Sequence, residues 1–227
     1  MNDLIWSATT WVLPALIAIT LHEAAHGWAA LKLGDDTAFR LGRVSFNPLR
    51  HVDPMGTVVL PAMLLIANSP FLFGWAKPVP VNFGWLNNPR RDMVLVAAAG
   101  PGINLLLAFV AALLYHAVPW LPDLPGEWLT DNLQNAIMLN LVLAVFNLIP
   151  IPPLDGGRIA VGLLPDALAL PLARLERFGM FILIGLLLIV PMVSAQLGYR
   201  INPFGAVLQP VVAFFYDLVV TAAGHHG

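Results

Sequence analysis

The chain has 227 residues, of which 59% are apolar and 11% are charged, and its formal net charge at pH 7 is −2. Soluble domains typically have roughly 45–50% apolar and about 25% charged residues. This composition therefore excludes a soluble globule and a disordered chain, and the lack of a basic cluster excludes a nucleic-acid partner. The absence of cysteine excludes disulfides, a zinc ribbon and a thiol nucleophile. We predict an integral protein of the lipid bilayer.

Six apolar stretches approach the length that crosses a bilayer, whose ~30 Å hydrocarbon core requires about 20 helical residues. They cover residues 4–21 (continuing, with charges, to about 31), 54–76, 93–122, 132–154, 178–199 and 201–216. The predicted fold class is an all-α polytopic membrane protein with about five to six transmembrane helices, forming a single domain over residues 1–227.

The region between residues 32 and 81 contains too many prolines and glycines for one continuous helix. We predict a re-entrant hairpin at 54–76, a short membrane-associated β segment at Arg43–Phe46 and extended chain at Lys77–Asn82. Irregular backbone at membrane depth is tolerated only where protein or a water-filled cavity covers it. This region is therefore expected beside a polar site.

The placement of charges predicts the orientation of the chain. Lysines and arginines occur at 32–50, 77–91 and 158–177, whereas 123–131 contains acidic residues and no basic ones. The positive-inside rule places the three basic connectors on the cytoplasmic side. The first two can share that side only if 54–76 enters the membrane and returns, which gives five true spans and an N-terminus outside.

The first span contains the motif His22-Glu23-Ala24-Ala25-His26. Histidines four residues apart lie on one helical face, about 6 Å apart along the axis, so both imidazoles can reach one metal ion. Glu23 is placed to act as a general base on a water molecule. The alternative to a metal site is a polar helix face that lines a cavity or a proton path. However, placing three ionisable groups in a membrane span without a partner costs free energy. This cost favours a metal.

A catalytic zinc usually has three protein ligands, and few carboxylates border the spans of this chain. Asp155 directly follows the 132–154 stretch, after Pro150, Pro152 and Pro153. If 54–76 is re-entrant, the first span and the 132–154 span run in the same direction, which brings Asp155 to the depth of the two histidines. The other interpretation, an ordinary turn with Asp155 as a solvated cap, stays open on the sequence alone.

These motifs resemble the site-2 protease family of intramembrane zinc metalloproteases. The resemblance rests on His-Glu-x-x-His in one membrane helix and Asn-x-x-Pro-x-x-Pro-Leu-Asp-Gly, at 147–156, in a later one. It also covers the stretches 42–54, 76–80 and 99–104. The chain is most similar to compact members that lack a PDZ insertion or a CBS domain, with a catalytic core at about 1–160 and flanking helices at about 174–223.

The resemblance implies one Zn²⁺ per chain, bound by His22, His26 and Asp155, with Glu23 as the general base. Asn147 matches the motif asparagine, which is expected to hold the substrate backbone or the oxyanion. The implied activity is regulated intramembrane proteolysis, the hydrolysis of a peptide bond within or next to a transmembrane segment of a protein substrate. We expect it in a bacterial cell membrane, with the active site towards the cytoplasm.

A transporter or channel that uses the same cluster as an ion or proton site is the alternative from another class. Transporters often contain repeat-related pairs of broken helices, and no internal repeat stands out here. Among the other polar residues, His51 and Asp53 are interpreted as a loop pair, His116 as an interfacial residue, and Asn104 as a packing residue that bonds across helices. The sequence does not indicate an oligomeric state.

Overall fold

The protein is built almost entirely of helices in the computed structural model, which describes residues 3–66, 74–199 and 202–225. Within these ranges, five helices are long and apolar enough to cross a membrane, at Ile5–Lys32, Pro89–Trp120, Asp123–Asn147, Glu176–Gln196 and Pro203–Ala222. The predicted all-helical class and the count of five spans are thereby confirmed.

The α-helices, in chain order, are α1 (Asp3–Lys32), α2 (Thr37–Arg40), α3 (Leu60–Ile66), α4 (Pro89–Leu114), α5 (Asp123–Asn147), α6 (Asp155–Leu163), α7 (Asp166–Arg174), α8 (Glu176–Ile184), α9 (Val190–Gln196) and α10 (Pro203–Ala222). Short 3₁₀ turns cover Pro48–Arg50, Phe83–Trp85 and Tyr115–Trp120, and π-helical turns cover Pro54–Val59 and Gly185–Ile189.

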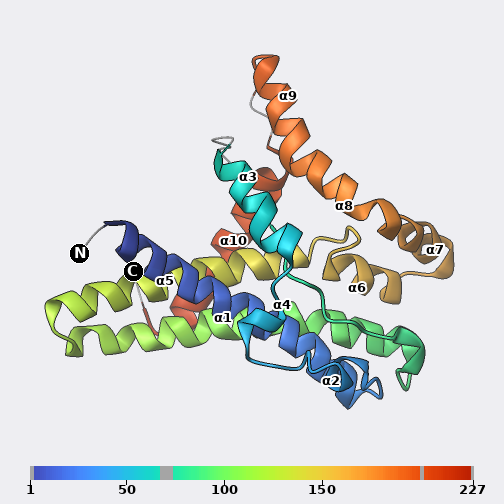
Figure 1. Ribbon diagram of the computed structural model, residues 1–227, viewed down its shortest axis with the longest axis horizontal. Coiled ribbons are helices and arrows are strands. Elements are labelled where there is room, and N and C mark those ends of the chain that lie inside the picture. The colour runs from blue at the N-terminus through green and yellow to red at the C-terminus, as the bar shows by residue number, and fades with distance from the viewer. Residues whose placement is uncertain (1–2, 67–73, 200–201, 226–227) are drawn as a thin grey trace.

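The centre of the molecule is a bundle of α1, α4 and α5, which lie side by side and contact one another along their lengths (Figure 1). Small residues permit this close packing, since Ala18 of α1, Ala108 and Ala112 of α4, and Ala144 of α5 are all fully buried. Short side chains allow membrane helices to approach until their backbones are nearly in contact. The bundle is therefore a rigid frame for side chains that point into it.

The remaining helices are arranged around this frame. Helix α10 packs against α5 and α4, and α6 packs against α4, where a Cβ on Gly162 would lie 2.3 Å from Val94 Cγ2. The continuous rod of α8 and α9 rises away from the bundle (Figure 1). Its middle part packs into a cluster of Leu154, Leu183 and Phe204. Both chain ends lie at one end of the bundle, and α2, α6 and α7 lie at the other.

The predicted β segment is wrong. No strand occurs within the described residues, and Arg43–Phe46 is irregular chain with bends that follows a turn at Leu41–Gly42. Gly42 has φ +64°, and Arg43 N donates to Ala38 O (2.8 Å). A strand needs a neighbouring strand to pair with, and none is available here. The acidic connector at 123–131 is helical, because α5 begins at Asp123, where a carboxylate interacts favourably with the helix dipole.

The predicted hairpin at 54–76 is helical over its first part, from Pro54 to Ile66, and residues 67–73 lie outside the described residues. Its two ends are in contact, since Trp75 N donates to Gly56 O (3.1 Å) and Thr57 Oγ1 donates to Trp75 O (2.9 Å). No β structure accompanies it in the described parts of the chain.

Candidate metal centre

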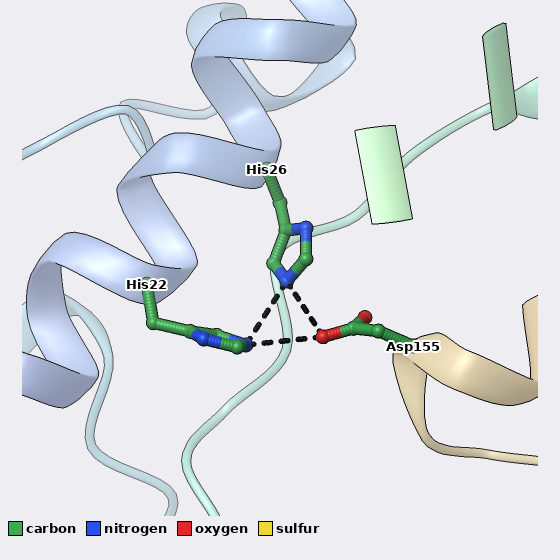
Figure 2. A group of neighbouring side chains, drawn as sticks. All are labelled: His22, His26 and Asp155. Carbon is green, nitrogen blue, oxygen red and sulfur yellow. Dashed lines mark hydrogen bonds and ion pairs between the residues drawn. The ribbon is translucent and has the colours of Figure 1, made fainter. Parts of the chain in front are cut away.

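Three side chains converge between α1 and α6. His22 and His26 extend from successive turns of α1, and Asp155 extends from the first residue of α6 (Figure 2). The two Nε2 atoms are 3.1 Å apart, and Asp155 Oδ2 lies 3.2 Å from Nε2 of His22 and 3.3 Å from Nε2 of His26. All three residues are buried. The structure therefore brings together the three residues that the sequence analysis expected to meet at one depth in the membrane.

The link between α5 and α6 explains why Asp155 is buried. After α5 ends at Asn147, the proline-rich link folds back over the start of α6. A Cβ on Gly156 would lie 2.2 Å from Leu148 O, and a Cβ on Gly157 would lie 2.4 Å from Pro152 N. Only glycine fits where two backbones approach this closely. Asp155 is 6% exposed, so its interpretation as a solvated cap is wrong.

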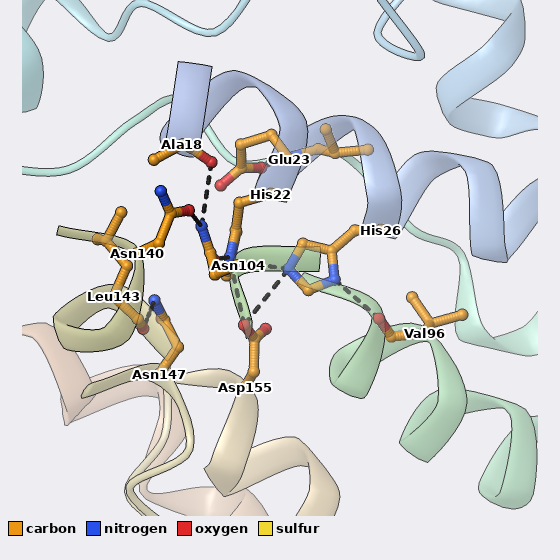
Figure 3. Close-up of polar contacts among 11 residues, drawn as sticks. Ala18, His22, Glu23, His26, Val96, Asn104, Asn140, Leu143, Asn147 and Asp155 are labelled. Carbon is orange, nitrogen blue, oxygen red and sulfur yellow. Dashed lines mark hydrogen bonds and ion pairs between the residues drawn. The ribbon is translucent and has the colours of Figure 1, made fainter. Parts of the chain in front are cut away.

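The second nitrogen of each imidazole is already engaged. His22 Nδ1 lies 2.6 Å from Asn104 Oδ1, and His26 Nδ1 lies 2.8 Å from Val96 O, both on α4 (Figure 3). Both partners are oxygen acceptors, so each Nδ1 must carry the proton and donate it. A neutral imidazole has one N–H and one lone pair, which leaves a lone pair on each Nε2.

The amide of Asn104 has a defined orientation. Its Nδ2 donates to Asn140 Oδ1 on α5 (2.8 Å) and to Ala18 O on α1 (3.3 Å), and Asn140 Nδ2 donates in turn to Ala136 O (2.8 Å). Asn104 Oδ1 must therefore face His22. This chain of hydrogen bonds connects all three central helices to one imidazole, which is how outer partners orient metal-binding histidines.

Three acceptors with no proton between them thus meet at the centre of the site. Asp155 Oδ2 is buried and has no hydrogen-bond donor among the described residues. An ionised carboxylate and two lone pairs at this distance repel one another unless a cation lies between them.

The spacing of the three atoms suits a tetrahedral metal ion. Zinc binds histidine nitrogen and carboxylate oxygen at about 2.0–2.2 Å, so neighbouring ligand atoms of a tetrahedron are roughly 3.3–3.5 Å apart. The observed separations of 3.1–3.3 Å are close to these values. The three residues also form the group of potential metal ligands found among the described residues. The donor set therefore fits zinc.

Helix α4 passes directly beneath the imidazoles at Gly100. A Cβ there would lie 2.4 Å from His26 Nε2 and 2.6 Å from His22 Cε1. Any side chain at this position would enter the space where the three ligand atoms meet. Gly100 is thus required by the close approach of α4 to the site.

The predicted base and the predicted oxyanion residue lie beside the cluster. Glu23 is half-buried next to His22 (Figure 3). Its Oε2 accepts a hydrogen bond from Val79 N (2.9 Å). Asn147, the last residue of α5, lies on the α5 side of Asp155 and donates one N–H to Leu143 O (3.0 Å). The Asn147 side-chain amide has a second N–H, which takes no part in the bond to Leu143 O.

Sequence reasoning missed the outer partners of the site. Asn104 was predicted to bond across helices, which it does, but its contact with His22 was not foreseen, and Asn140 and the Val96 carbonyl were not singled out. Asparagines buried in membrane spans are uncommon, and this signal could have identified Asn104 and Asn140 as candidate site residues. His51, whose Nε2 lies 2.9 Å from Ser45 O, is outside the metal cluster.

Comparisons with known proteins agree with this geometry. The family model of "Peptidase family M50" matches residues 124–190, which include Asn147 and Asp155. The chain is 37% identical over 212 residues to "Putative zinc metalloprotease YwhC" of Bacillus subtilis (strain 168), an overlap of 88% of this chain and 93% of that protein. The chain belongs to peptidase family M50. This M50 chain is accordingly an integral membrane metalloprotease, as predicted.

Other M50 relatives are more distant. "Putative zinc metalloprotease Rip2" of Mycolicibacterium smegmatis is 31% identical over 177 residues, 78% of this chain and 65% of the relative. Rip2 of Mycobacterium tuberculosis (strain Erdman) is 34% identical over 141 residues, 62% of this chain and 52% of the relative. No solved structure matches the chain. Because the chain belongs to a peptidase family, the comparisons favour a protease over a transporter or channel.

Proposed function

We propose that this protein is a zinc-dependent intramembrane endopeptidase that hydrolyses a peptide bond within or next to a transmembrane segment of a protein substrate. The observation that carries the proposal is the buried triangle of His22, His26 and Asp155, with three lone pairs facing one another inside a membrane-spanning bundle. A buried polar site inside a membrane-spanning bundle suits a substrate that itself lies in the bilayer. This activity corresponds to regulated intramembrane proteolysis.

The predicted zinc cofactor agrees with two findings, the donor set of the site and the zinc metalloprotease names of the relatives. His22 Nε2, His26 Nε2 and Asp155 Oδ2 would hold the ion. When bound, zinc supplies a Lewis acid that polarises the scissile carbonyl and activates a water molecule for attack. The hydrogen bonds from Nδ1 of each histidine fix the tautomer that leaves the lone pair on Nε2, and they aim both imidazoles at the ion.

Proton transfer is assigned to Glu23. Its carboxylate takes a proton from the attacking water and passes it to the amide nitrogen that leaves, so one water is consumed and two chain ends are formed. The second N–H of Asn147 is available to donate a hydrogen bond to the oxyanion that develops on the carbonyl oxygen. Glu23 extends towards the metal cluster from α1, and Asn147 extends towards it from the end of α5.

The orientation that we propose places the site near the cytoplasmic face of a bacterial cell membrane. The basic connectors, the positive-inside rule and the bacterial relatives support it. The hydrogen bond between Trp75 and Gly56 supports a re-entrant path for 54–76, since a segment whose ends meet has returned to the depth at which it left.

Single cysteines test the orientation, because the native chain has none. Cysteines placed at Arg50 and Asn88 are expected to react with an impermeant maleimide only from the cytoplasmic side, and a cysteine at Glu127 only from outside. Labelling of positions 50 and 88 from opposite sides would eliminate the re-entrant path.

The function itself is tested by Glu23→Gln, which removes the base while leaving the metal ligands in place. The purified enzyme in liposomes, presented with a library of single-span substrates, is expected to cleave some of them, and the variant to lose at least about 100-fold in rate with zinc retained. A variant that cleaves at the wild-type rate would exclude Glu23 as the base. Wild-type protein that cleaves nothing but moves zinc across the bilayer would instead indicate a transporter.

A further inference from the structure

An extended segment holds the base. Residues Lys77–Asn82, here called the strap, run beside the C-terminal half of α1 and are anchored at both ends. Lys77 O accepts from Arg43 Nη2 (2.6 Å) and Lys77 N donates to His51 O (2.9 Å). At the other end Asn82 N donates to Asp35 Oδ2 (2.7 Å), and Asp35 is fully buried. The strap is therefore fixed against the helix that carries Glu23.

Val79 occupies the middle of the strap and contacts α1 through both its side chain and its backbone. Its side chain is 7% exposed and lies against Gly27, where a Cβ would be 3.2 Å from Val79 Cγ1. Gly27 is one helical turn after Glu23 and on the same face of α1. The missing side chain at Gly27 thus leaves room for Val79, and the Val79 N–H reaches Glu23 Oε2 at 2.9 Å.

The neighbouring prolines restrict this part of the strap. Pro78 and Pro80 have no N–H, so the hydrogen-bond donor within residues 78–80 is Val79 alone. A residue that precedes proline is also disfavoured in the helical region and held in extended conformations, which applies to both Lys77 and Val79. The donor is therefore presented to Glu23 by a stretch of chain with little conformational freedom.

From this geometry we propose that Val79 is a positioning residue for catalysis. Its backbone N–H holds Oε2 of Glu23 and leaves Oε1 to take the proton of the attacking water. A glutamate has three rotatable side-chain bonds, and small displacements of a catalytic group lower rates by as much as about 100-fold. The inference rests on the proposed function, because it assigns a partner to the base of that reaction.

A first test needs no activity. Hydrogen–deuterium exchange of the Val79 amide is expected to be slow in the native protein and at least about tenfold faster in Glu23→Ala, which removes the acceptor. The amide of Val81 is the internal reference, because it has no hydrogen-bond partner in the described residues. Equal exchange of Val79 in both proteins would show that the contact does not hold the strap, and would overturn the proposal.

A second test removes the donor alone. Incorporating the α-hydroxy acid analogue of valine at position 79 replaces the N–H by oxygen and keeps the side chain. We expect kcat to fall about 10- to 100-fold while KM and bound zinc stay unchanged. Val79→Ala, which keeps the N–H but loses packing against Gly27, should lower thermal stability and should lower kcat by less than the ester does. The same ester at position 81 is the matched control.

The outcomes separate this inference from the function on which it rests. If Glu23→Gln is inactive and the ester at position 79 has wild-type kcat, the positioning role is wrong and the function stands. If Val79→Ala loses as much kcat as the ester, packing of the side chain is responsible and the proposal fails. If Glu23→Gln retains full activity, the proposed function fails first.

Discussion

Two pairs of neighbouring histidines occur among the described residues, one inside the bundle and one at the end where the chain termini lie, and they differ in which nitrogen is free. His22 and His26 meet edge to face, with ring centroids 4.7 Å apart and Nε2 atoms pointing at each other. His116 and His225 stack in parallel at 4.1 Å, and their Nε2 atoms bond instead to Ala223 O (2.7 Å) and Ala112 O (2.8 Å). The second pair attaches the C-terminal segment to α4.

The comparison shows that proximity of two histidines does not make a metal site. In the first pair, α4 supplies acceptors for both Nδ1 atoms, and this forces both lone pairs inward towards Asp155. In the second pair the carbonyls take the Nε2 protons, and no carboxylate joins the two rings among the described residues. The outer partners of the imidazoles therefore decide the chemistry.

The strongest test of this contrast compares alanine substitutions in the two pairs. His22→Ala and Asp155→Ala are expected to lower bound zinc from about one ion per chain to nearly none, because two ligands cannot replace three. His116→Ala and His225→Ala should retain full zinc and full cleavage. Elemental analysis of the purified proteins measures the zinc content. Full retention of zinc in Asp155→Ala would remove that residue from the ligand set.

Gly100 provides a test of the space beneath the first pair. Gly100→Ala places a methyl group 2.4 Å from His26 Nε2, so the imidazole must move away from the metal position. We expect cleavage to fall by about 100-fold, with weaker zinc binding. Gly102→Ala is the matched control on the same helix, since nothing lies within 4 Å of a Cβ at that position. Equal activity of the two variants would contradict the described packing of α4.

The smallest of these effects is expected from Asn104, which does not contact the ion. Asn104→Ala leaves the His22 Nδ1 proton without its acceptor and should weaken zinc binding about 10- to 100-fold, measured by competition with a chelator. Asn135→Ala serves as control, because Asn135 Nδ2 also bonds between helices, to Thr10 O (2.9 Å), but not near the metal. If both variants bind zinc equally well, the hydrogen bond to His22 contributes only to packing.

The parts of this site that could be predicted are those encoded in a local pattern. The spacing of His22 and His26 requires only the helical period, and Asp155 followed from counting the directions of successive spans. The residue type marks Asn104 and Asn140 as polar groups within spans, but their contacts with His22 and with each other depend on how α4 and α5 are rotated about their axes. The role of the Val96 carbonyl cannot be predicted from the residue type, because every residue has a backbone carbonyl.

The irregular region after α1 was harder to predict for a different reason. Strand formation at Arg43–Phe46 was expected from residue type, but pairing needs a partner strand, and the Arg43 side chain bonds instead to Lys77 O. The extended chain predicted at Lys77–Asn82 has no helix or strand in the structure. Its contact with Glu23 is formed by a backbone N–H, which no motif reveals.

The placement of Asp155 at the start of α6 has a consequence for the order in which the protein is made. A ribosome synthesises both histidines and the proposed base with α1, and the supporting glycine and asparagine with α4, long before the proposed third ligand exists. Asp155 becomes available only after α5 and its proline-rich link have been completed. A nascent or prematurely terminated chain in the membrane therefore contains an incomplete site. Proteolytic competence is delayed until most of the bundle has assembled.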